Sequence, residues 1–291
     1  EMAAPLPICY LNGEWLPLAE AKISPLDRSF LFGDGVYEVV PVFAGRPFRF
    51  DEHFDRLGRS CAALRLRDPH DRDVWRAILR GLLDRNGGGD LYVYLQISRG
   101  ADVERAHAPL PQIPPTVFGF AAPLAQASAE QLARGIRCVT APDIRWARCD
   151  IKSVALLGNV LQRQLSCDVG ADETILLRDG QMMEATASTV HVVLADTIVT
   201  PPNSNAILPG TTRSVVEEVA DRLEIARATR SVSEAELRSA QEVWISSSTR
   251  TVSAVTTLDG RPVGSGKPGP VWQRMYQGIA TLQRELATQP W

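Results

Sequence analysis

Lysine is almost missing from this chain: only three of its 31 basic residues are lysines, and arginine supplies the rest. Arginine stays protonated in proteins, whereas a lysine amine shielded from water can lose its proton and attack a carbonyl. Lys22 precedes a Ser-Pro turn signal and Lys267 lies in "GSGKPGP", so both are expected in solvated loops. Lys152 precedes the apolar residues 154–157 and is expected to be partly buried. It is either a Schiff-base lysine or an ordinary lysine at a half-exposed strand end.

The chain also lacks the spacings that mark metal sites or disulfide frameworks. Its five cysteines are widely separated, no C-x-x-C pair occurs, and its four histidines are scattered. We therefore predict no metal site. Unpaired cysteines are typical of a reducing compartment, so we expect a cytoplasmic protein.

Long apolar runs and an excess of positive charge are absent as well. No apolar stretch is long enough to cross a bilayer, and the first residues lack the pattern of a secretory signal, so we expect no membrane partner. A net charge of −3 argues against nucleic-acid binding. The composition, 45% hydrophobic and 22% charged, is ordinary for a soluble globular enzyme.

Strand and helix patterns are mixed without regular alternation, which predicts an α+β fold. Asn12-Gly13 and Ala44-Gly45 separate apolar runs and predict two hairpins. We expect a helix capped by Asp51 and another over residues 153–169. The Ala/Pro/Ser-rich stretch "AAPLAQASAEQ" predicts a domain boundary near residue 126.

Groups suited to a phosphate occur at three places. "LPGTTR", residues 208–213, combines a glycine with two threonines at a helix start, and "SSST", residues 246–249, offers hydroxyls at a strand end. Arg56 lies on the first long helix, one position before Leu57 of its apolar stripe, and could reach an anion. Ordinary capping, turn chemistry or a solvent-directed arginine would explain each feature alone.

Glu184, in "MMEATAST", follows an apolar strand. If Lys152 binds a cofactor as a Schiff base, Glu184 could pair with a protonated ring nitrogen of that cofactor. A buried carboxylate is costly without a cationic partner, so Glu184 should have one if it is buried. The alternative is a solvated glutamate at a strand end.

Seven stretches, in sequence order, form a recognisable pattern: "DRSFLFGDGVYEVVPVFAGRPF", "DEHFDRL", "SRGADVERAHAPLP", "DIRWARCDIKSVALLGNVL", "DETILLRDGQMMEATAS", "ILPGTTRSVV" and "SSST". Through them the sequence resembles the fold-type IV pyridoxal-phosphate aminotransferases, and within that family the enzymes acting on D-amino acids. The resemblance spans nearly the whole chain. It implies a two-domain fold-type IV enzyme, with a smaller N-terminal α/β domain (1–126) and a larger C-terminal, β-barrel-like domain with flanking helices that binds pyridoxal 5′-phosphate (127–291).

The resemblance also implies residue roles. Lys152 would form the Schiff base and move the proton between substrate Cα and the cofactor, and Glu184 would pair with the pyridine nitrogen. Arg145 would support the site near the phosphate. The phosphate would be held by Arg56, Thr211, Thr212, Ser247 and Ser248, and the substrate pocket would be lined by Tyr37, Val39 and Leu208.

Arg105 and His107, in "ERAHAP", match the pair that binds the substrate α-carboxylate in D-amino acid aminotransferases; without the resemblance, they read as exposed loop residues. The resemblance therefore implies ping-pong transamination between D-amino acids and 2-oxo acids, such as D-alanine with 2-oxoglutarate. It also implies a homodimer in which each subunit supplies this loop to the site of its neighbour. The alternatives are a branched-chain or R-amine transaminase, an aminodeoxychorismate-type lyase, or a non-catalytic cofactor-binding protein. Three positions depart from the family pattern: Ala187, Thr189 and Arg250.

Overall fold

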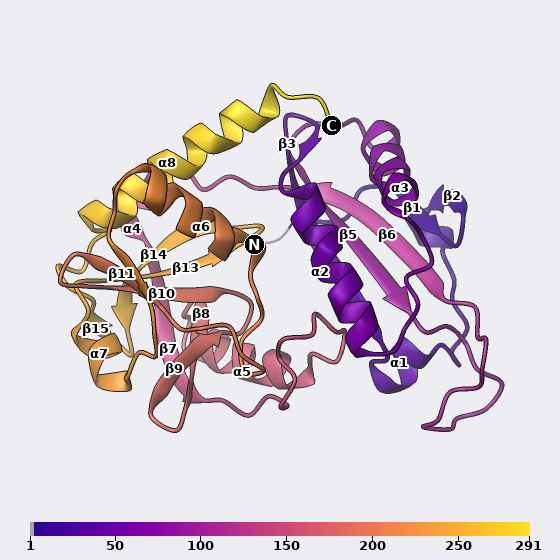
Figure 1. The fold of residues 1–291 in the computed structure, drawn as a ribbon, viewed down its shortest axis with the longest axis horizontal. Helices are drawn as coiled ribbons and strands as arrows, with labels where there is room; N and C mark the ends of the chain where they lie inside the picture. Colours follow the sequence, from indigo (N-terminus) through magenta and orange to yellow (C-terminus); the bar gives the residue numbers. More distant parts are fainter. Residues whose placement is uncertain (1–2) are drawn as a thin grey trace. The chain divides into compact units, whose positions relative to one another are not determined.

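The computed structural model describes residues 3–291, which form two compact units (Figure 1). Unit 1 comprises the chain up to Ala125 together with Ile151–Leu156 and Ala287–Trp291, and unit 2 comprises Gln126–Asp150 and Leu157–Leu286. The first junction lies between Ala125 and Gln126. The expected second domain, 127–291, is not one continuous unit, because the segment that carries Lys152 groups with unit 1.

Unit 1 is built on an antiparallel six-stranded sheet in the order β2-β1-β6-β5-β3-β4. Both expected hairpins are confirmed: Asn12 and Ala44 have φ near 50°, and each precedes a glycine with positive φ, as tight hairpin turns require. The elements of unit 1 are β1 (Ile8–Leu11), β2 (Glu14–Pro17), the short 3₁₀ helix η1 (Leu18–Glu20), α1 (Arg28–Phe32), β3 (Gly35–Phe43), β4 (Arg46–Pro47), α2 (Phe50–Ala63), α3 (Arg72–Arg85), β5 (Leu91–Ser98) and β6 (Thr116–Pro123).

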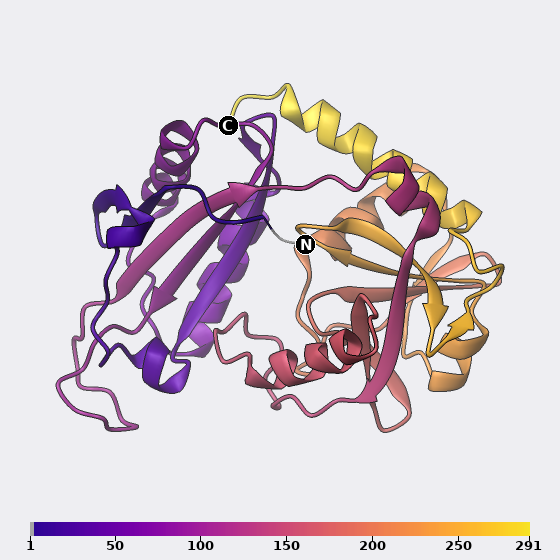
Figure 2. The ribbon, with the colours of Figure 1, turned by 180° about the vertical axis from the view of Figure 1, so that it is seen from behind.

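Helices α2 and α3 cover one face of this sheet (Figures 1 and 2), and their apolar stripes form a single core with alternate residues of the strands. Phe54 and Leu57 from α2 and Trp75 from α3 are among its buried members. The expected capping role of Asp51 is wrong. Helix α2 begins at Phe50, after Arg49 in a left-handed conformation, so Asp51 lies in the first turn, where its carboxylate interacts favourably with the helix dipole.

Unit 2 contains a nine-stranded mixed sheet, ordered β12-β11-β10-β13-β14-β7-β8-β9 with β15 paired to β14. Only residues 186–188 join β9, at one edge, to β10, near the other edge, so the sheet must curl. This is the expected barrel-like architecture. Its elements are α4 (Ala129–Arg134), β7 (Ile136–Pro142), α5 (Leu157–Asp168), β8 (Glu173–Arg178), β9 (Gln181–Ala185), β10 (Thr189–Leu194), β11 (Thr197–Thr200), α6 (Thr211–Arg222), β12 (Arg227–Thr229), α7 (Glu234–Ser239), β13 (Glu242–Ser247), β14 (Thr251–Leu258), β15 (Arg261–Pro262) and α8 (Pro270–Ala287).

The helix expected over residues 153–169 begins only at Leu157. The preceding residues are held in place by β3: the Tyr37 amide donates to the Lys152 carbonyl at 3.0 Å, and the Val154 amide donates to Gly35 at 3.0 Å. These hydrogen bonds override the apolar pattern of the segment.

Helix α8 lies beside α6 (Figure 1), where Gly278 allows close packing against Val219. Its first turn is capped from the sheet by the buried Glu242, whose carboxylate accepts hydrogen bonds from the amides of Val271 (2.9 Å) and Trp272 (2.8 Å). Among residues 3–291, no helix is long and apolar enough to cross a membrane.

Replacing Glu242 tests this cap. Glu242→Ala leaves two buried amides without their acceptor, so we expect the free energy of unfolding to fall by about 1–2 kcal/mol in chemical denaturation. Glu285→Ala, at an exposed position of the same helix, should change it by less than about 0.5 kcal/mol. Equal effects of the two substitutions would contradict the capping role.

Candidate functional site

Lys152 lies beside β3 in unit 1. Its amide donates to Ser60 Oγ at 3.1 Å and its carbonyl accepts from Tyr37, so both backbone groups are fixed. Its side chain is half-buried, and Nζ lies 4.2 Å from the centroid of the Tyr37 ring. Lys22 and Lys267 are exposed, as expected. The amine is thus directed onto an aromatic face, and its role in a Schiff base stays a prediction.

Tyr37 and Val39 lie on the sheet face opposite α2, because side chains alternate along β3 and Val36, Glu38 and Val40 are buried in the other direction. Both are half-buried. Tyr37 stacks on Tyr94 with a centroid distance of 5.5 Å. The two predicted pocket residues therefore share one face with the lysine amine.

Arg56 lies on the other side of the sheet, on α2. Its Nε donates to Glu38 Oε1 at 2.7 Å and its Nη2 donates to Oε2 at 2.8 Å, while His53 Nδ1 lies 2.7 Å from Oε2. All three side chains are at most 4% exposed. Burial alone would raise the pKa of Glu38, but the Arg56 charge and the hydrogen bonds hold it well below its usual value. Burial lowers the pKa of His53, so its ring is neutral at pH 7.

Sequence reasoning missed Glu38, although a signal was present. Glu38 occupies a core register between Val36 and Val40, and a charged residue there requires a buried partner. The partner turns out to be Arg56, the arginine predicted to hold a phosphate. The structure thus shows what orients Arg56, and its contact with a phosphate stays a prediction.

Glu184 lies on β9 in unit 2 and is 5% exposed. The expected cationic partner is Arg145: its Nη1 donates to Glu184 Oε1, and it also bonds Asp143 through Nε (3.0 Å) and Nη2 (2.9 Å). The Leu208 amide donates to both Glu184 oxygens, at 3.2 and 3.1 Å. Burial raises the pKa of Glu184 to about 7, while Arg145 and the Leu208 amide oppose that shift.

Arg145 was expected near the phosphate, but its guanidinium contacts Glu184, the residue assigned to the ring nitrogen. It also donates to the Ala206 carbonyl at 3.0 Å, which ties it to the segment before Leu208. Leu208, expected as a pocket wall, acts on Glu184 through its backbone amide. These two residues orient the carboxylate.

The predicted phosphate groups of unit 2 lie together where α6 begins. Gly210 precedes the helix without a side-chain cap, and the first turn carries no acidic residue. Thr211 Oγ1 lies 3.5 Å from Ser248 Oγ, and Thr212 follows directly in the first turn. Ser247 ends β13, one residue before Ser248. A helix start with adjacent hydroxyls is a suitable binding place for an anion.

The three departures from the family pattern have different surroundings. Ala187 and Arg250 are exposed, and the Arg250 amide donates to Ser247 Oγ at 3.3 Å. Thr189 is buried, and a Cβ built on Gly210 would lie 2.8 Å from its Oγ1. The hydroxyl of Thr189 is therefore compatible with this backbone only because residue 210 is glycine.

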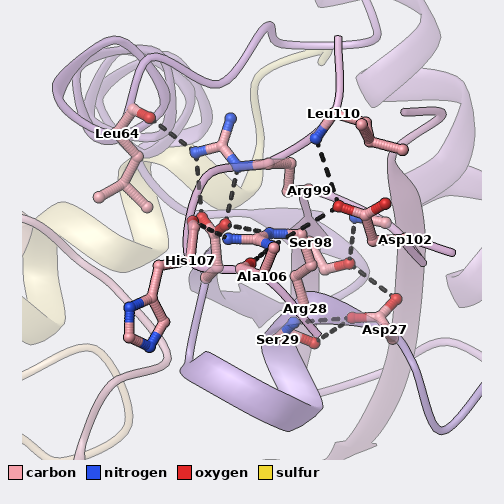
Figure 3. Close-up of polar contacts among 12 residues, drawn as sticks. Asp27, Arg28, Ser29, Leu64, Ser98, Arg99, Asp102, Ala106, His107 and Leu110 are labelled. Atoms are coloured by element: carbon pink, nitrogen blue, oxygen red, sulfur yellow. Dashed lines mark hydrogen bonds and ion pairs between the residues drawn. The ribbon is translucent and has the colours of Figure 1, made fainter. Parts of the chain in front are cut away.

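Arg105 and His107 are exposed and lie in unit 1 on the loop between β5 and β6; Figure 3 labels His107. The Arg105 guanidinium lies 5.1 Å from the centroid of the Phe32 ring, and His107 meets the same ring edge-on at 5.6 Å. The structure thus brings both side chains to one aromatic residue. Within residues 3–291, no cluster of histidine, cysteine, aspartate or glutamate is suited to hold a metal ion.

Comparison with known proteins gives one consistent family. The amino-transferase class IV model matches residues 35–258. D-alanine aminotransferase of Bacillus licheniformis is 37% identical over 92% of this chain and 94% of that protein. The corresponding protein of Staphylococcus haemolyticus is 35% identical, with 93% and 95% covered.

Solved structures with the same fold include two branched-chain amino acid aminotransferases. The Escherichia coli structure has a TM-score of 0.90 at 26% identity and covers 95% of this chain and 94% of its own. The structure from T.th. with pyridoxamine 5′-phosphate has a TM-score of 0.88 at 26% identity, with 97% and 94% covered. The expected family and its two-domain fold are confirmed.

The raised pKa of Glu184 makes stability depend on pH. Because the folded-state pKa lies above the usual 4.5, folded protein holds this proton more tightly than unfolded protein, and the resulting stabilisation is lost as pH rises from about 4.5 to about 7. Glu184→Gln removes this dependence. Between pH 5 and pH 8, the unfolding free energy of the ligand-free variant should rise relative to wild type by roughly 2–3 kcal/mol in urea titrations.

Glu14→Gln, at an exposed strand position, is the matched control and should follow the wild-type pH profile. Parallel profiles for Glu184→Gln and wild type would show that Glu184 does not titrate in this range.

Proposed function

We propose that this chain, which belongs to the amino-transferase class IV family, transfers amino groups between D-amino acids and 2-oxo acids in two half-reactions. D-Alanine and 2-oxoglutarate, giving pyruvate and D-glutamate, are the expected pair. The similarity to D-alanine aminotransferases over more than nine-tenths of the chain carries this proposal. The Arg105–His107 pair supports it with a carboxylate-binding chemistry. Branched-chain transamination is the alternative, since the structural neighbours at 26% identity have that activity in their names.

The expected cofactor is pyridoxal 5′-phosphate, which when bound supplies an aldehyde and an electron-accepting ring. The chain has the complementary groups: an amine on an aromatic face, a buried carboxyl with a cationic neighbour, and a helix start beside hydroxyls. Glu184 is the most informative of these. A buried carboxylate oriented by Arg145 and the Leu208 amide is suited to accept a hydrogen bond from a protonated pyridine nitrogen.

Lys152 would hold the cofactor aldehyde and move the proton at substrate Cα. Its backbone is fixed at both ends, so only the side chain moves, and the Tyr37 ring limits where the amine can lie. Tyr37 is in turn held by stacking on Tyr94. Preorganisation of this kind lowers the entropy cost of proton transfer.

The phosphate would be held by Arg56, by the amides and hydroxyls of Thr211 and Thr212, and by Ser247 and Ser248. The helix start favours a dianion because no carboxylate competes in its first turn. Arg56 is oriented for such a role by its two hydrogen bonds to Glu38.

The substrate α-carboxylate would bind Arg105 and His107, with Val39 and Leu208 next to the side-chain pocket. Fixing the carboxylate determines which face of Cα is presented to the amine, which is how the pair would select the D enantiomer. Because both side chains are exposed here, we propose that they act in the site of a partner subunit in a homodimer.

Helix α5 supports the homodimer proposal. Its outer face exposes a stripe of apolar side chains that a monomer would leave in water: Leu157 (71% exposed), Val160 (61%), Leu161 (54%) and Leu165 (47%). Apolar stripes of this kind mark interfaces. The five free thiols further support a reducing, cytoplasmic location.

D-Alanine should bleach the visible absorption of the holo-protein, and 2-oxoglutarate should restore it. L-Leucine and an R-amine, tested in parallel, should leave the spectrum unchanged. Bleaching by L-leucine but not by D-alanine would favour the branched-chain alternative. Release of pyruvate from an aminodeoxychorismate-like substrate without an amino acceptor would favour a lyase. If no D- or L-amino acid changes the absorption spectrum, a non-catalytic binding protein would be favoured.

Borohydride reduction of the holo-protein followed by peptide mass spectrometry should place the cofactor on Lys152. Lys152→Ala should lose the tag, whereas Lys22→Ala and Lys267→Ala, which alter the two exposed lysines, should keep it. A tag on either of those lysines in wild type would disprove the assignment.

The dimer can be tested by light scattering after size exclusion. A charge in the apolar stripe, as in Leu161→Glu, should convert a dimer to a monomer because the glutamate would be buried without a partner. Val74→Glu, at an exposed valine of α3, should leave the mass unchanged. A monomeric wild type, or a dimer that tolerates Leu161→Glu, would contradict this interface.

A further inference from the structure

Arg28, the first residue of α1, is 3% exposed and uses its charge on backbone carbonyls (Figure 3). Its Nη1 donates to Ala106 O at 2.6 Å and its Nη2 donates to His107 O at 2.7 Å. These carbonyls belong to the residues just after Arg105. A buried guanidinium therefore holds the backbone of the loop that carries the predicted carboxylate pair.

Two carboxylates complete this support. Asp34 accepts from Arg28 Nε at 2.9 Å and is also bound by Arg99 at 2.7 and 3.0 Å. Asp102 lies 3.7 Å from Arg28 Nη1 and accepts from the Leu110 amide at 3.3 Å. The start and the end of the loop are thus tied to the same charge network.

Helix α1 is itself anchored to the sheet that the loop leaves and re-enters. Asp27 caps it by accepting from Ser29 N at 2.9 Å. The same carboxylate accepts from Ser98 Oγ at 2.8 Å, where β5 ends, and from Thr116 Oγ1 at 2.7 Å, where β6 begins. The support is therefore fixed with respect to both strands.

Phe32, at the other end of α1, contacts the side chains of Arg105 and His107. The guanidinium carbons of Arg28 and Arg105 lie 4.8 and 5.1 Å from its ring centroid. His107 packs against the same ring at an interplanar angle of 77°. Cation–π and edge contacts of this kind restrict the rotamers of long exposed side chains.

We propose that Arg28 and Phe32 are positioning residues for substrate recognition: Arg28 fixes the backbone of residues 106 and 107, and Phe32 aligns Arg105 and His107 as one carboxylate receptor. This inference rests on the proposed function, in which that pair binds the α-carboxylate. A loop of this length would otherwise sample many conformations, and substrate binding would have to order it. Because Arg28 and Phe32 order the loop when the protein folds, the carboxylate receptor is already formed before substrate binds.

Stopped-flow half-reactions with D-alanine test the proposal. Arg28→Gln should raise the half-saturating D-alanine concentration about 10- to 100-fold, with the maximal rate and the cofactor absorption changed only a few-fold. Arg28→Lys should not restore binding, because one ammonium keeps the charge but cannot donate to both carbonyls in the same geometry. Arg227→Gln, which breaks an exposed two-bond pair with Asp221, is the matched control and should behave as wild type.

A double-mutant cycle and proteolysis separate positioning from general stability. In an Arg105→Ala background, Arg28→Gln should weaken D-alanine binding little further, because both changes act on one receptor.

Without any substrate, trypsin should cleave the Arg28→Gln variant after Arg105 at least about tenfold faster than wild type, because the peptide bond after Arg105 is released from its support. Phe32→Leu, which leaves the buried charges intact, should weaken D-alanine binding without faster cleavage, and it decides the matter if Arg28→Gln does not fold.

The outcomes distinguish the two proposals. If wild type does not respond to D-alanine, the proposed function fails. If wild type responds and Arg105→Ala weakens binding, but Phe32→Leu and any folded Arg28 variant bind D-alanine as wild type does, the positioning roles are overturned. Restoration of binding by Arg28→Lys would reduce the role of Arg28 to its charge and would also overturn the two-carbonyl support.

Discussion

The hydrogen bonds between β3 and residues 152–154 are the constraint on which the chemistry of unit 1 depends. They hold the lysine by its backbone, beside a strand whose alternate residues face opposite sides. One register therefore places Tyr37 next to the amine and Glu38 in the core, where it orients Arg56. A shift of one residue along β3 would exchange these faces and separate the amine from its aromatic neighbour.

Three buried charge pairs or contacts have the same effect: one charged side chain fixes the orientation of its partner. Glu38 fixes Arg56, Arg145 fixes Glu184, and Arg28 fixes two carbonyls of a loop. Burying ions is costly, so such pairs are weak evidence for stability. Their benefit here is geometric, because a charged side chain with two hydrogen bonds has few alternative orientations.

Features that depend on neighbouring residues could be predicted from the sequence, and features that depend on distant partners could not. The turn at Asn12-Gly13 follows from local backbone preferences, and the family motifs predict a role for Lys152 without any structure. The late start of α5 is set by contacts with β3, more than a hundred residues earlier. The contacts of Arg28 reach almost eighty residues along the chain, so no local pattern could show them.

Unit 1 is assembled from three separate stretches of the chain, and this affects how the protein folds during synthesis. Its first strands leave the ribosome early, yet it incorporates Ile151–Leu156 and Ala287–Trp291, and the Trp291 ring lies 6.3 Å from Phe50. During translation, unit 1 therefore waits for residues that emerge after nearly all of unit 2. A nascent chain arrested before residue 151 would leave the edge of β3 at Gly35–Tyr37 without its partner segment, and severing the chain at that point would separate Lys152 from the strand that holds it.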